Sequence, residues 1–330
     1  MNVLSLFDGI SAGRVALEKA GIVVDNYYAS EIDRYAMQVS KKNYPDIKQL
    51  GDISIWRGWD IDWSSIDLVI GGSPCQGFSI AGRQLNFNDP RSKLFFDFVD
   101  ICDHVADMNP NMKFLLENVK MKQEFQDVIN KYMGIEPIVI NSSLLSAQNR
   151  VRLYWTNIPN IIQPEDKGIV LSDILEDKVD DKYYLTAEAI DYMSRLRNGK
   201  QRWEYHKNPI DGKAACLTAN MYKGIPYGVV RLSKCEQIAT LEMKGNDCIR
   251  RVYNEQGKSP FLTTSVGGHR QPKVFDYTKE LARKLTPLEC ERLQAFPDGY
   301  TEGVSNTQRY KALGNSWTVD VIAHIFKQLL

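Results

Sequence analysis

The chain has 330 residues, of which 43% are hydrophobic and 25% are charged, values close to the average for globular proteins. This composition excludes a disordered chain, a collagen-like fibre and a disulfide-stapled miniprotein, and the length suits one large domain or two modest ones. Lysine plus arginine equals aspartate plus glutamate at 41 each, so the overall charge alone indicates no polyanionic partner.

The sequence predicts a cytoplasmic protein without a membrane anchor. No uncharged apolar run approaches the roughly 18 residues of a membrane helix, and the amino-terminal stretch lacks a basic region ahead of its apolar residues, so no signal peptide is expected. The six cysteines and four histidines are scattered without a C-x-x-C pair. We therefore expect reduced thiols and no metal site.

Strand-like and helix-like segments alternate in the first half of the chain. Ser11 is the expected N-cap of the first helix, Gly21 is the expected residue after its C-cap, and Pro45 ends the second helix. Because strands and helices alternate, the sequence predicts right-handed crossovers and a mostly parallel twisted sheet, which is the α/β class. We expect strands at 2–7, 26–30, 67–70, 113–116, 138–140 and 151–155, and helices near 11–20, 34–43, 93–105 and 122–132.

The pattern changes after Trp155. Residues 160–191 are acidic and partly loop-like, whereas residues 195–273, the basic module, hold 15 basic and six acidic side chains, a local charge of +9. A positive module on a negative body is typical of a surface that binds a polyanion, although many charge runs are only solvated surface. Helical periodicity returns only at 286–294 and 319–330, which indicates that the module is inserted into the α/β domain.

Glycines and acidic residues follow three successive predicted strands. The first strand leads into FDGISAG (7–13), where two glycines let a ligand approach the backbone and the helix start favours anionic groups. Glu31 follows the second strand, and Gly51-Asp52-Ile53 follows the third. Each of these glycines and acidic residues is common in turns when taken by itself. Together, after successive strands, they favour a nucleoside-bearing ligand at one edge of the sheet. The spacing of the glycines does not match the dinucleotide fingerprint.

A cysteine, a carboxylate and two arginines follow the later strands. Cys75 lies in GGSPCQGFS (71–79), a loop whose exposure would permit the thiolate character of a nucleophile. Glu117 ends an apolar strand, where a charge is avoided unless it is paired or functional. QNRVR (148–152) leads into a strand that would place its arginines on one face. An arginine and a carboxylate converging on a thiol suit the polarisation of a planar heterocycle.

These motifs together resemble the cytosine-C5 DNA methyltransferase family. FDGISAG, Glu31, GDI, GGSPCQGFS, ENV and QNRVR fall in the family order, and RKLTPLECERLQAFPDGY (283–300) and GNSWTVDVI (314–322) complete the set. The resemblance implies a Rossmann-like class I methyltransferase domain formed by residues 1–159 and 283–330. It also implies a smaller, basic target-recognition domain formed by residues 160–282.

The resemblance implies transfer of a methyl group from S-adenosylmethionine to carbon 5 of a cytosine flipped out of duplex DNA. Cys75 would attack carbon 6 of the ring, Glu117 would hold and protonate nitrogen 3, and Arg152 would contact the carbonyl oxygen. Arg150 and Gln148 would support the site. The cofactor, which becomes S-adenosylhomocysteine, would lie against residues at matching family positions: Phe7, Asp8, Gly9, Gly13, Glu31, Asp52, Ile53, Pro74, Leu94, Asn315 and Ser316.

The basic module also matches the family in part. Arg251-Val252-Tyr253 and Gly257-x-x-x-x-Leu262-Thr263 resemble its base-reading region, but Phe261 replaces the small residue often found before the leucine. Ser92 replaces a glycine that is common in the loop expected to close over the substrate. The recognised DNA sequence therefore does not follow from the resemblance. The residues expected to contact DNA are Arg251, Arg250, Arg270, Gln271 and Ser79.

Two other functions are consistent with parts of the sequence. A related branch of the family acts on transfer RNA, but the insert of over 100 residues and the PCQGFS loop favour DNA. A catalytically inactive DNA-binding regulator is disfavoured because Cys75, Glu117 and Arg152 are all present. We expect a monomeric enzyme with duplex DNA as its partner, nucleoid-associated if it is prokaryotic or phage-encoded. A cognate restriction endonuclease system is a further candidate partner.

Overall fold

The protein is described here from a computed structural model that covers residues 1–73, 90–183, 237–240, 251–253, 273–276 and 281–330. The chain divides into two units. The first comprises Met1–Ile140, Val151–Gln163 and Val319–Leu330, and the second comprises Asn141–Arg150 and Pro164–Thr318. The predicted target-recognition domain, residues 160–282, lies largely outside the described residues, so its boundaries stay a prediction.

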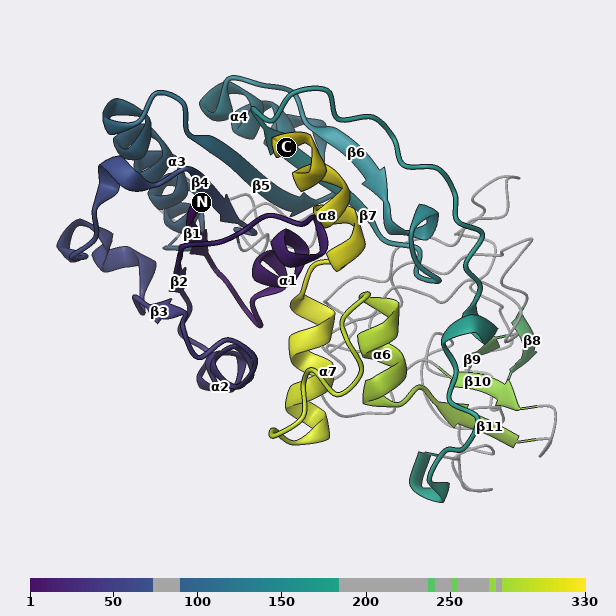
Figure 1. Ribbon diagram of the computed structural model, residues 1–330. Coiled ribbons are helices and arrows are strands. Elements are labelled where there is room, and N and C mark those ends of the chain that lie inside the picture. Colours follow the sequence, from purple (N-terminus) through teal and green to yellow (C-terminus); the bar gives the residue numbers. More distant parts are fainter. Residues whose placement is uncertain (74–89, 184–236, 241–250, 254–272, 277–280) are drawn as a thin grey trace. The chain divides into compact units, whose positions relative to one another are not determined.

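A seven-stranded sheet forms the centre of the first unit (Figure 1). Four of its strand pairs, β1–β2, β1–β4, β2–β3 and β4–β5, are parallel, and β5–β7 is antiparallel, which confirms the mostly parallel α/β sheet. The order reverses direction between β1 and β4, and such a switch point is where open α/β sheets bind their ligands. In spatial order the strands are β3 (Lys48–Gln49), β2 (Asn26–Ser30), β1 (Asn2–Leu6), β4 (Leu68–Gly71), β5 (Lys113–Val119), β7 (Val151–Thr156) and β6 (Ile138–Asn141).

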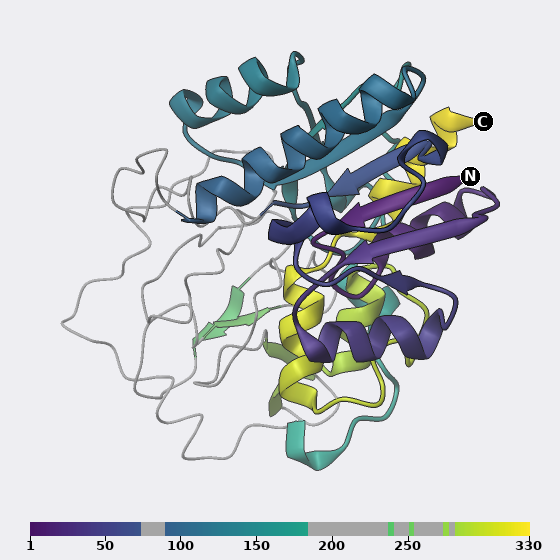
Figure 2. The ribbon, with the colours of Figure 1, turned by 90° about the vertical axis from the view of Figure 1, so that its left-hand side faces the viewer.

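Helices cover both faces of this sheet (Figures 1 and 2). Side chains of α3 (Pro90–Met108), α4 (Gln123–Met133) and the short 3₁₀ helix η1 (Ile53–Gly58) join those of the strands in one hydrophobic core. On the other face, α1 (Ala12–Lys19) packs against α8 (Val319–Phe326). The other helical elements among the described residues of this unit are α2 (Arg34–Asn43), η2 (Trp63–Ser65) and η10 (Lys327–Leu329).

The described part of the second unit contains two helices and a small sheet. Thr286 and Glu289 form a capping box at the start of α6 (Pro287–Leu293), and α7 (Asn306–Asn315) follows it. The sheet has the order β11 (Leu281–Lys284), β10 (Lys273–Asp276), β9 (Arg251–Tyr253), β8 (Gln237–Thr240). Short 3₁₀ turns occur at η4 (Ser142–Leu144), η5 (Leu171–Ile174) and η6 (Asp181–Tyr183).

Most predicted elements of the first half are present, with three corrections. The helix predicted near 93–105 begins at Pro90, so Ser92 lies in α3 and not in a loop before it. Ser11 does stand at the N-cap of α1, but its φ is 60° and its side chain makes no capping hydrogen bond, because the hydroxyl donates to Asp8 instead. The sequence predicts that Glu117 directly follows a strand at 113–116. In the structure the strand is longer and Glu117 lies within β5. Gly21 has a φ of 80° directly after the C-cap, as expected.

The expectation that helical periodicity returns only at 286–294 and 319–330 is wrong, because α7 lies between them. Its sequence, NTQRYKALGN, buries only Tyr310, Leu313 and Gly314. This apolar stripe is too short to stand out in a sequence pattern. The helix predicted at 319–330 ends at Phe326 and continues as the 3₁₀ turn η10.

We expect Gly71→Ala to lower the free energy of unfolding by about 1–3 kcal/mol, the usual cost of overpacking. A Cβ at this position would lie 2.9 Å from Cε2 of Phe98 and 3.0 Å from the carbonyl oxygen of Leu6, so β4 would have to move away from α3 and β1. Gly58→Ala is the matched control, because its Cβ would meet no atom within 4 Å. Thermal melting of both variants checks this, and equal melting temperatures would contradict it.

Candidate active site

The loop after β1 has an unusual backbone. Phe7, Gly9 and Ser11 have φ angles of 57°, 59° and 60°, and residues other than glycine rarely adopt this left-handed region. The amide of Asp8 donates to the carbonyl of Ser30 at 3.0 Å, which ties the loop to the end of β2. Asp8 is only 9% exposed, and its carboxylate is bound by hydroxyl groups within the first unit. Gly13 is buried in the first turn of α1.

Glu31 brings the end of β2 to this loop. Its Oε2 accepts a hydrogen bond from the amide of Gly9 at 2.8 Å, and its Oε1 accepts from the amides of Ile32 and Asp33, each at 2.8 Å. A carboxylate offers about four acceptor positions, so one stays free for a hydroxyl donor. The half-buried Glu31 therefore fits a ribose of a bound nucleoside.

Asp52 and Ile53 stand at the same edge of the sheet, after β3. β1, β2 and β3 run parallel, so their carboxyl ends lie together, and the hydroxyl of Ser30 donates to the carbonyl of Gly51 at 2.7 Å. Asp52 is exposed, and its Oδ1 accepts from the amide of Ser54 at 2.8 Å. The Ile53 side chain is 4% exposed and belongs to the hydrophobic core. Its backbone is thus the part available to a ligand.

The predicted nucleophile lies outside the described residues, as do Pro74 and Ser79, but the residues leading to it are described. Ser73 follows β4 and is 5% exposed. The side-chain amide of Asn118 in β5 donates to the Ser73 carbonyl at 3.3 Å and to its hydroxyl at 3.2 Å. This contact links the end of β4, which leads into the Cys75 loop, to the strand that carries Glu117.

Glu117 and Arg152 form a buried ion pair. Nε of Arg152 lies 2.8 Å from Oε1 of Glu117, and the side chains are 3% and 11% exposed. Glu117 faces Tyr154 across the antiparallel β5–β7 pair, so Arg152, two residues before Tyr154, is its diagonal neighbour on the same face. Nη1 of Arg152 also donates to the carbonyl of Val151 at 2.8 Å. The arrangement holds the carboxylate in a fixed position near the carboxyl end of a central strand.

Arg150 and Gln148 belong to the second unit and hold the end of α7. Nη2 of Arg150 donates to the carbonyl of Ser316 at 2.9 Å, and Nη1 lies 3.5 Å from the carbonyl of Gly314. A cation that binds the last carbonyls of a helix satisfies groups that would otherwise lack partners. Nε2 of Gln148 donates to Oε1 of Gln294 at 3.0 Å, and Nε2 of Gln294 donates to the carbonyl of Leu313 at 2.6 Å. Both residues thus fix the backbone at 313–316.

Ser316, directly after α7, has a buried hydroxyl group. It is 8% exposed, and its hydroxyl has no hydrogen-bond partner among the described residues. A buried polar atom without a partner is costly unless a ligand or water satisfies it. Asn315 beside it is exposed. The hydroxyl of Ser316 and the carboxylate of Glu31 both fit the polar groups of S-adenosylmethionine, each within its own unit.

Sequence reasoning missed three buried residues that position these groups, Asn118, Ser73 and Gln294. Asn118 and Ser73 lie inside motifs already recognised, ENV and GGSPCQGFS, and Gln294 interrupts the apolar pattern of 283–300. Polar residues inside otherwise apolar stretches were the available signal. Among the residues predicted to read DNA, Arg251 begins β9, whereas Arg250, Arg270 and Gln271 lie outside the described residues. Leu94 is half-buried on α3 and packs against the core.

Two cysteines can be described, and neither is a candidate nucleophile. Cys102 and Cys290 are buried, and burial raises the pKa of both thiols. In the described ranges no group of three or more His, Cys, Asp or Glu side chains could hold a metal ion. None of the helices described is both long and apolar enough to cross a membrane.

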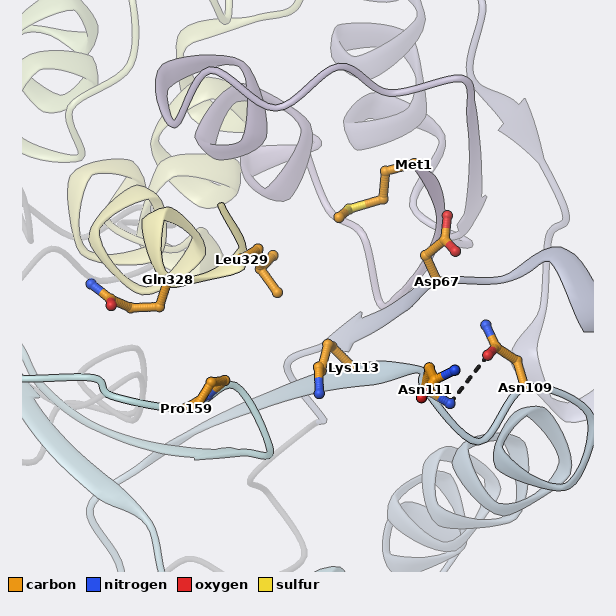
Figure 3. Close-up of a pocket in the computed structure, with 8 residues that line it drawn as sticks. All are labelled: Met1, Asp67, Asn109, Asn111, Lys113, Pro159, Gln328 and Leu329. Carbon is orange, nitrogen blue, oxygen red and sulfur yellow. Dashed lines mark hydrogen bonds between the residues drawn. The ribbon is translucent and has the colours of Figure 1, made fainter.

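A cavity of about 440 Å³ lies at the opposite edge of the sheet (Figure 3). Met1, Asp67 and Lys113 line it and stand at the amino ends of β1, β4 and β5. Gln328 and Leu329, after α8, complete another side. Ligands of open α/β sheets bind at the carboxyl ends of the strands, so this cavity is not the candidate site.

Comparisons with known proteins identify the family. A model of the family described as C-5 cytosine-specific DNA methylase matches residues 1–330. The chain is 30% identical to the type II methyltransferase M.HpaII of Haemophilus parainfluenzae, covering 99% of this chain and 88% of that protein. It is 27% identical to the orphan methyltransferase M.Rho11sI of Bacillus phage rho11s, covering 100% and 98%.

Solved structures share the fold. The methyltransferase EhMeth of Entamoeba histolytica is 18% identical with a TM-score of 0.64, covering 100% of this chain and 99% of that chain. A mutant of DNMT2 from Spodoptera frugiperda is 19% identical with a TM-score of 0.63, covering 99% of both chains. The fold is therefore the Rossmann-like class I methyltransferase fold, and because the family match spans all 330 residues, the chain belongs to the C-5 cytosine-specific DNA methylase family.

Proposed function

We propose that the protein transfers a methyl group from S-adenosylmethionine to carbon 5 of a cytosine extruded from duplex DNA, through a covalent adduct with Cys75. The observation that carries the proposal is the buried Glu117–Arg152 pair, with 2.8 Å between Nε and Oε1. A carboxylate and a guanidinium fixed side by side match the nitrogen and carbonyl oxygen on one edge of a cytosine ring. The match to the family described as C-5 cytosine-specific DNA methylase supports DNA as the substrate.

In the proposed reaction, the Cys75 thiolate forms a bond to carbon 6 of cytosine while Glu117 gives a proton to nitrogen 3. The electron pair of the carbon 5–carbon 6 double bond then makes carbon 5 nucleophilic. S-adenosylmethionine, when bound, supplies an electrophilic methyl group to that carbon. A water molecule takes the proton from carbon 5, the electron pair of that C–H bond reforms the double bond and expels the sulfur of Cys75 as a thiolate, and nitrogen 3 returns its proton to Glu117. Arg152 orients Glu117 and binds the ring carbonyl.

The residues proposed to bind the cofactor are assigned from the family motifs and are described within each unit separately. Phe7, Gly9 and Gly13 would present the loop after β1, Glu31 would bind the ribose and Asp52 with the backbone of Ile53 would bind the base. Pro74, Leu94, Asn315 and Ser316 complete the set by their motif positions. The free acceptor position of Glu31 and the unpartnered hydroxyl of Ser316 support this assignment.

The DNA substrate can be tested directly against RNA. Purified protein would be incubated with S-adenosylmethionine labelled in the methyl group and with either a mixed-sequence duplex DNA or transfer RNA. We expect label in DNA alone, at carbon 5 of cytosine in one sequence context, which bisulfite sequencing of the product would read. Label in transfer RNA alone would support the RNA enzyme instead, and DNA binding without any transfer would support the inactive regulator.

The basic module is the proposed contact surface for DNA phosphates. We expect the affinity for duplex DNA to fall steeply with salt, because each phosphate contact releases counterions and contributes about −0.9 to the slope of log K against log salt. Arg251→Ala should make the slope shallower by about one if Arg251 binds a phosphate, and weaken binding to the recognised site alone if it binds a base. Fluorescence anisotropy at several salt concentrations measures both.

A matched control for this titration is Arg57→Ala. Arg57 is an exposed arginine of the first unit that pairs with Asp100 at 2.8 Å, and the proposal assigns it no role in DNA binding. Its slope should equal that of the unaltered protein. A flat salt response of the unaltered protein would contradict the basic module as the contact surface.

A further inference from the structure

Asp8 is a buried carboxylate held by hydroxyl groups rather than by a cation. Its Oδ1 accepts from the hydroxyls of Ser5 at 2.6 Å and Tyr27 at 2.8 Å, and its Oδ2 accepts from the hydroxyl of Ser11 at 2.5 Å. No described residue forms an ion pair with it. Three donors aimed at one carboxyl group suit the ionised form, since each carboxylate oxygen can only accept. The side chain thus joins β1, β2 and the start of α1.

The loop that Asp8 joins needs such support. Phe7 and Ser11 flank it with left-handed backbones that L residues rarely adopt. The loop is also held by backbone contacts, from the Asp8 amide to Ser30 at 3.0 Å and from the Ser11 amide to the Asp8 carbonyl at 3.0 Å. The hydrogen bond from the Ser11 hydroxyl to the Asp8 carboxylate is the side-chain contact that holds Ser11. Without this hydrogen bond, the backbone of Ser11 would be free to leave its left-handed conformation.

We propose that Asp8 is a positioning residue: contrary to the expectation from the family resemblance, its side chain does not bind the cofactor, but its ionised carboxylate holds the loop 7–11 in the shape that does. This inference rests on the proposed function, in which that loop binds S-adenosylmethionine. It assigns to Asp8 a different role from its neighbours Phe7 and Gly9, which would face the ligand.

Protonation of Asp8 would change the hydrogen bonds of the loop. A neutral carboxyl group must donate its own hydrogen, and the hydroxyl of Ser11 would then have to turn from Asp8 and donate to the hydroxyl of Ser40, 2.6 Å away. Among the described residues, the titratable groups that face Asp8 are Tyr27 of β2 and Glu31 after it, while α2 contributes the neutral Ser40. The two protonation states therefore differ at Ser11, where α1 begins.

Burial raises the pKa of Asp8 from 3.8 to about 6, and the negative charge of Glu31 adds to the rise, while the hydroxyls of Ser11, Ser5 and Tyr27 oppose it. A carboxyl group whose pKa is higher in the folded than in the unfolded protein favours folding in its neutral form. Its contribution to stability is present at low pH and is lost as the pH rises from about 4 through 6. At pH 7.5 the ionised group therefore destabilises the cofactor-free protein.

The test is Asp8→Asn, which keeps the shape of the side chain and mimics its neutral form. At pH 7.5 we expect a higher melting temperature without cofactor, and weaker binding of both S-adenosylmethionine and S-adenosylhomocysteine by roughly tenfold, about the effect of one lost hydrogen bond. In the unaltered protein both affinities should fall as the pH is lowered from 7.5 to 5.5, and in the variant they should stay flat. Calorimetric titration measures these affinities.

The use of both ligands separates positioning from direct charge attraction. S-adenosylmethionine carries a sulfonium charge and S-adenosylhomocysteine does not, so a positioning residue affects both equally. A loss confined to S-adenosylmethionine would overturn the inference. Tyr27→Phe removes one hydrogen-bond donor to Asp8 and leaves the carboxylate in place. It should lower the affinity for both ligands.

Asp60→Asn is the matched control, because Asp60 is an exposed aspartate of the same unit. The affinities of this variant for both ligands and its melting temperature should equal those of the unaltered protein. If the Asp8→Asn variant had unaltered affinities and an unaltered melting temperature, this inference would be overturned but the proposed function would not. Unaltered protein that bound neither ligand would overturn the proposed function, and this inference with it.

Discussion

Cys75→Ala should reduce methyl transfer to duplex DNA by roughly 10⁴-fold or more, the size of effect seen when a covalent nucleophile is removed. Carbon 5 of cytosine becomes nucleophilic only after a sulfur–carbon bond has formed at carbon 6. Alanine cannot form that bond, whereas the surfaces that bind DNA and cofactor are unchanged. Single-turnover transfer of a labelled methyl group measures the loss, and affinities for DNA and S-adenosylmethionine should stay close to those of the unaltered protein.

Cys102→Ala is the matched control for this variant. Cys102 is 7% exposed in the hydrophobic core, and its removal should leave the transfer rate unchanged. Duplex DNA containing 5-fluorocytosine gives an independent test, because its carbon 5 carries no proton to lose and the adduct should persist. We expect a denaturant-resistant complex with the unaltered protein and none with Cys75→Ala. Retained turnover in Cys75→Ala would exclude it as the nucleophile.

Glu117→Gln should slow the transfer by about 10²–10⁴-fold, the typical contribution of a general acid. Glutamine keeps the shape of the side chain but cannot deliver a proton to nitrogen 3 of the ring. It also leaves the guanidinium of Arg152, which is 3% exposed, without its charged partner. Removing one member of a buried ion pair costs about 3–5 kcal/mol, so the melting temperature should fall as well.

The loss of chemistry and the loss of stability can be separated. The rate of Glu117→Gln would be measured well below its melting temperature, together with its affinity for S-adenosylmethionine, which should stay close to normal. Arg152→Met removes the other member of the pair and leaves the carboxylate, so it should destabilise the protein comparably. A normal transfer rate in Glu117→Gln would mean that another group activates the ring.

The elements of the first unit could be predicted because their apolar residues recur with the period of a strand or a helix. β2 and α2 begin and end at the predicted residues. α7 could not be predicted, because its buried residues, Tyr310, Leu313 and Gly314, are too few to show a helical period in the sequence. The short β10, KVFD, likewise shows no clear alternation; its position depends on pairing with β11.

Motifs in the sequence identify the residues of the candidate site, and their chemical roles stay predictions, whereas the contacts between these residues could not be predicted. The sequence places Glu117 and Arg152 on two strands, but their 2.8 Å contact depends on the antiparallel register of β5 and β7. The bonds from Asn118 to Ser73 and from Gln148 to Gln294 likewise join residues far apart in the chain. Hydrogen bonds between buried side chains depend on three-dimensional position, which periodicity does not contain.

The packing of α1 against α8 has a consequence for how the protein is made. Lys19 and Asp320 form an ion pair at 2.8 Å across 301 residues of sequence, and α8 packs on α1. A ribosome adding roughly 5–20 residues per second needs about 15–60 s to travel between them. Throughout that interval α1 lacks its native contact with α8, so the first unit can complete its packing only after α8 has been synthesised.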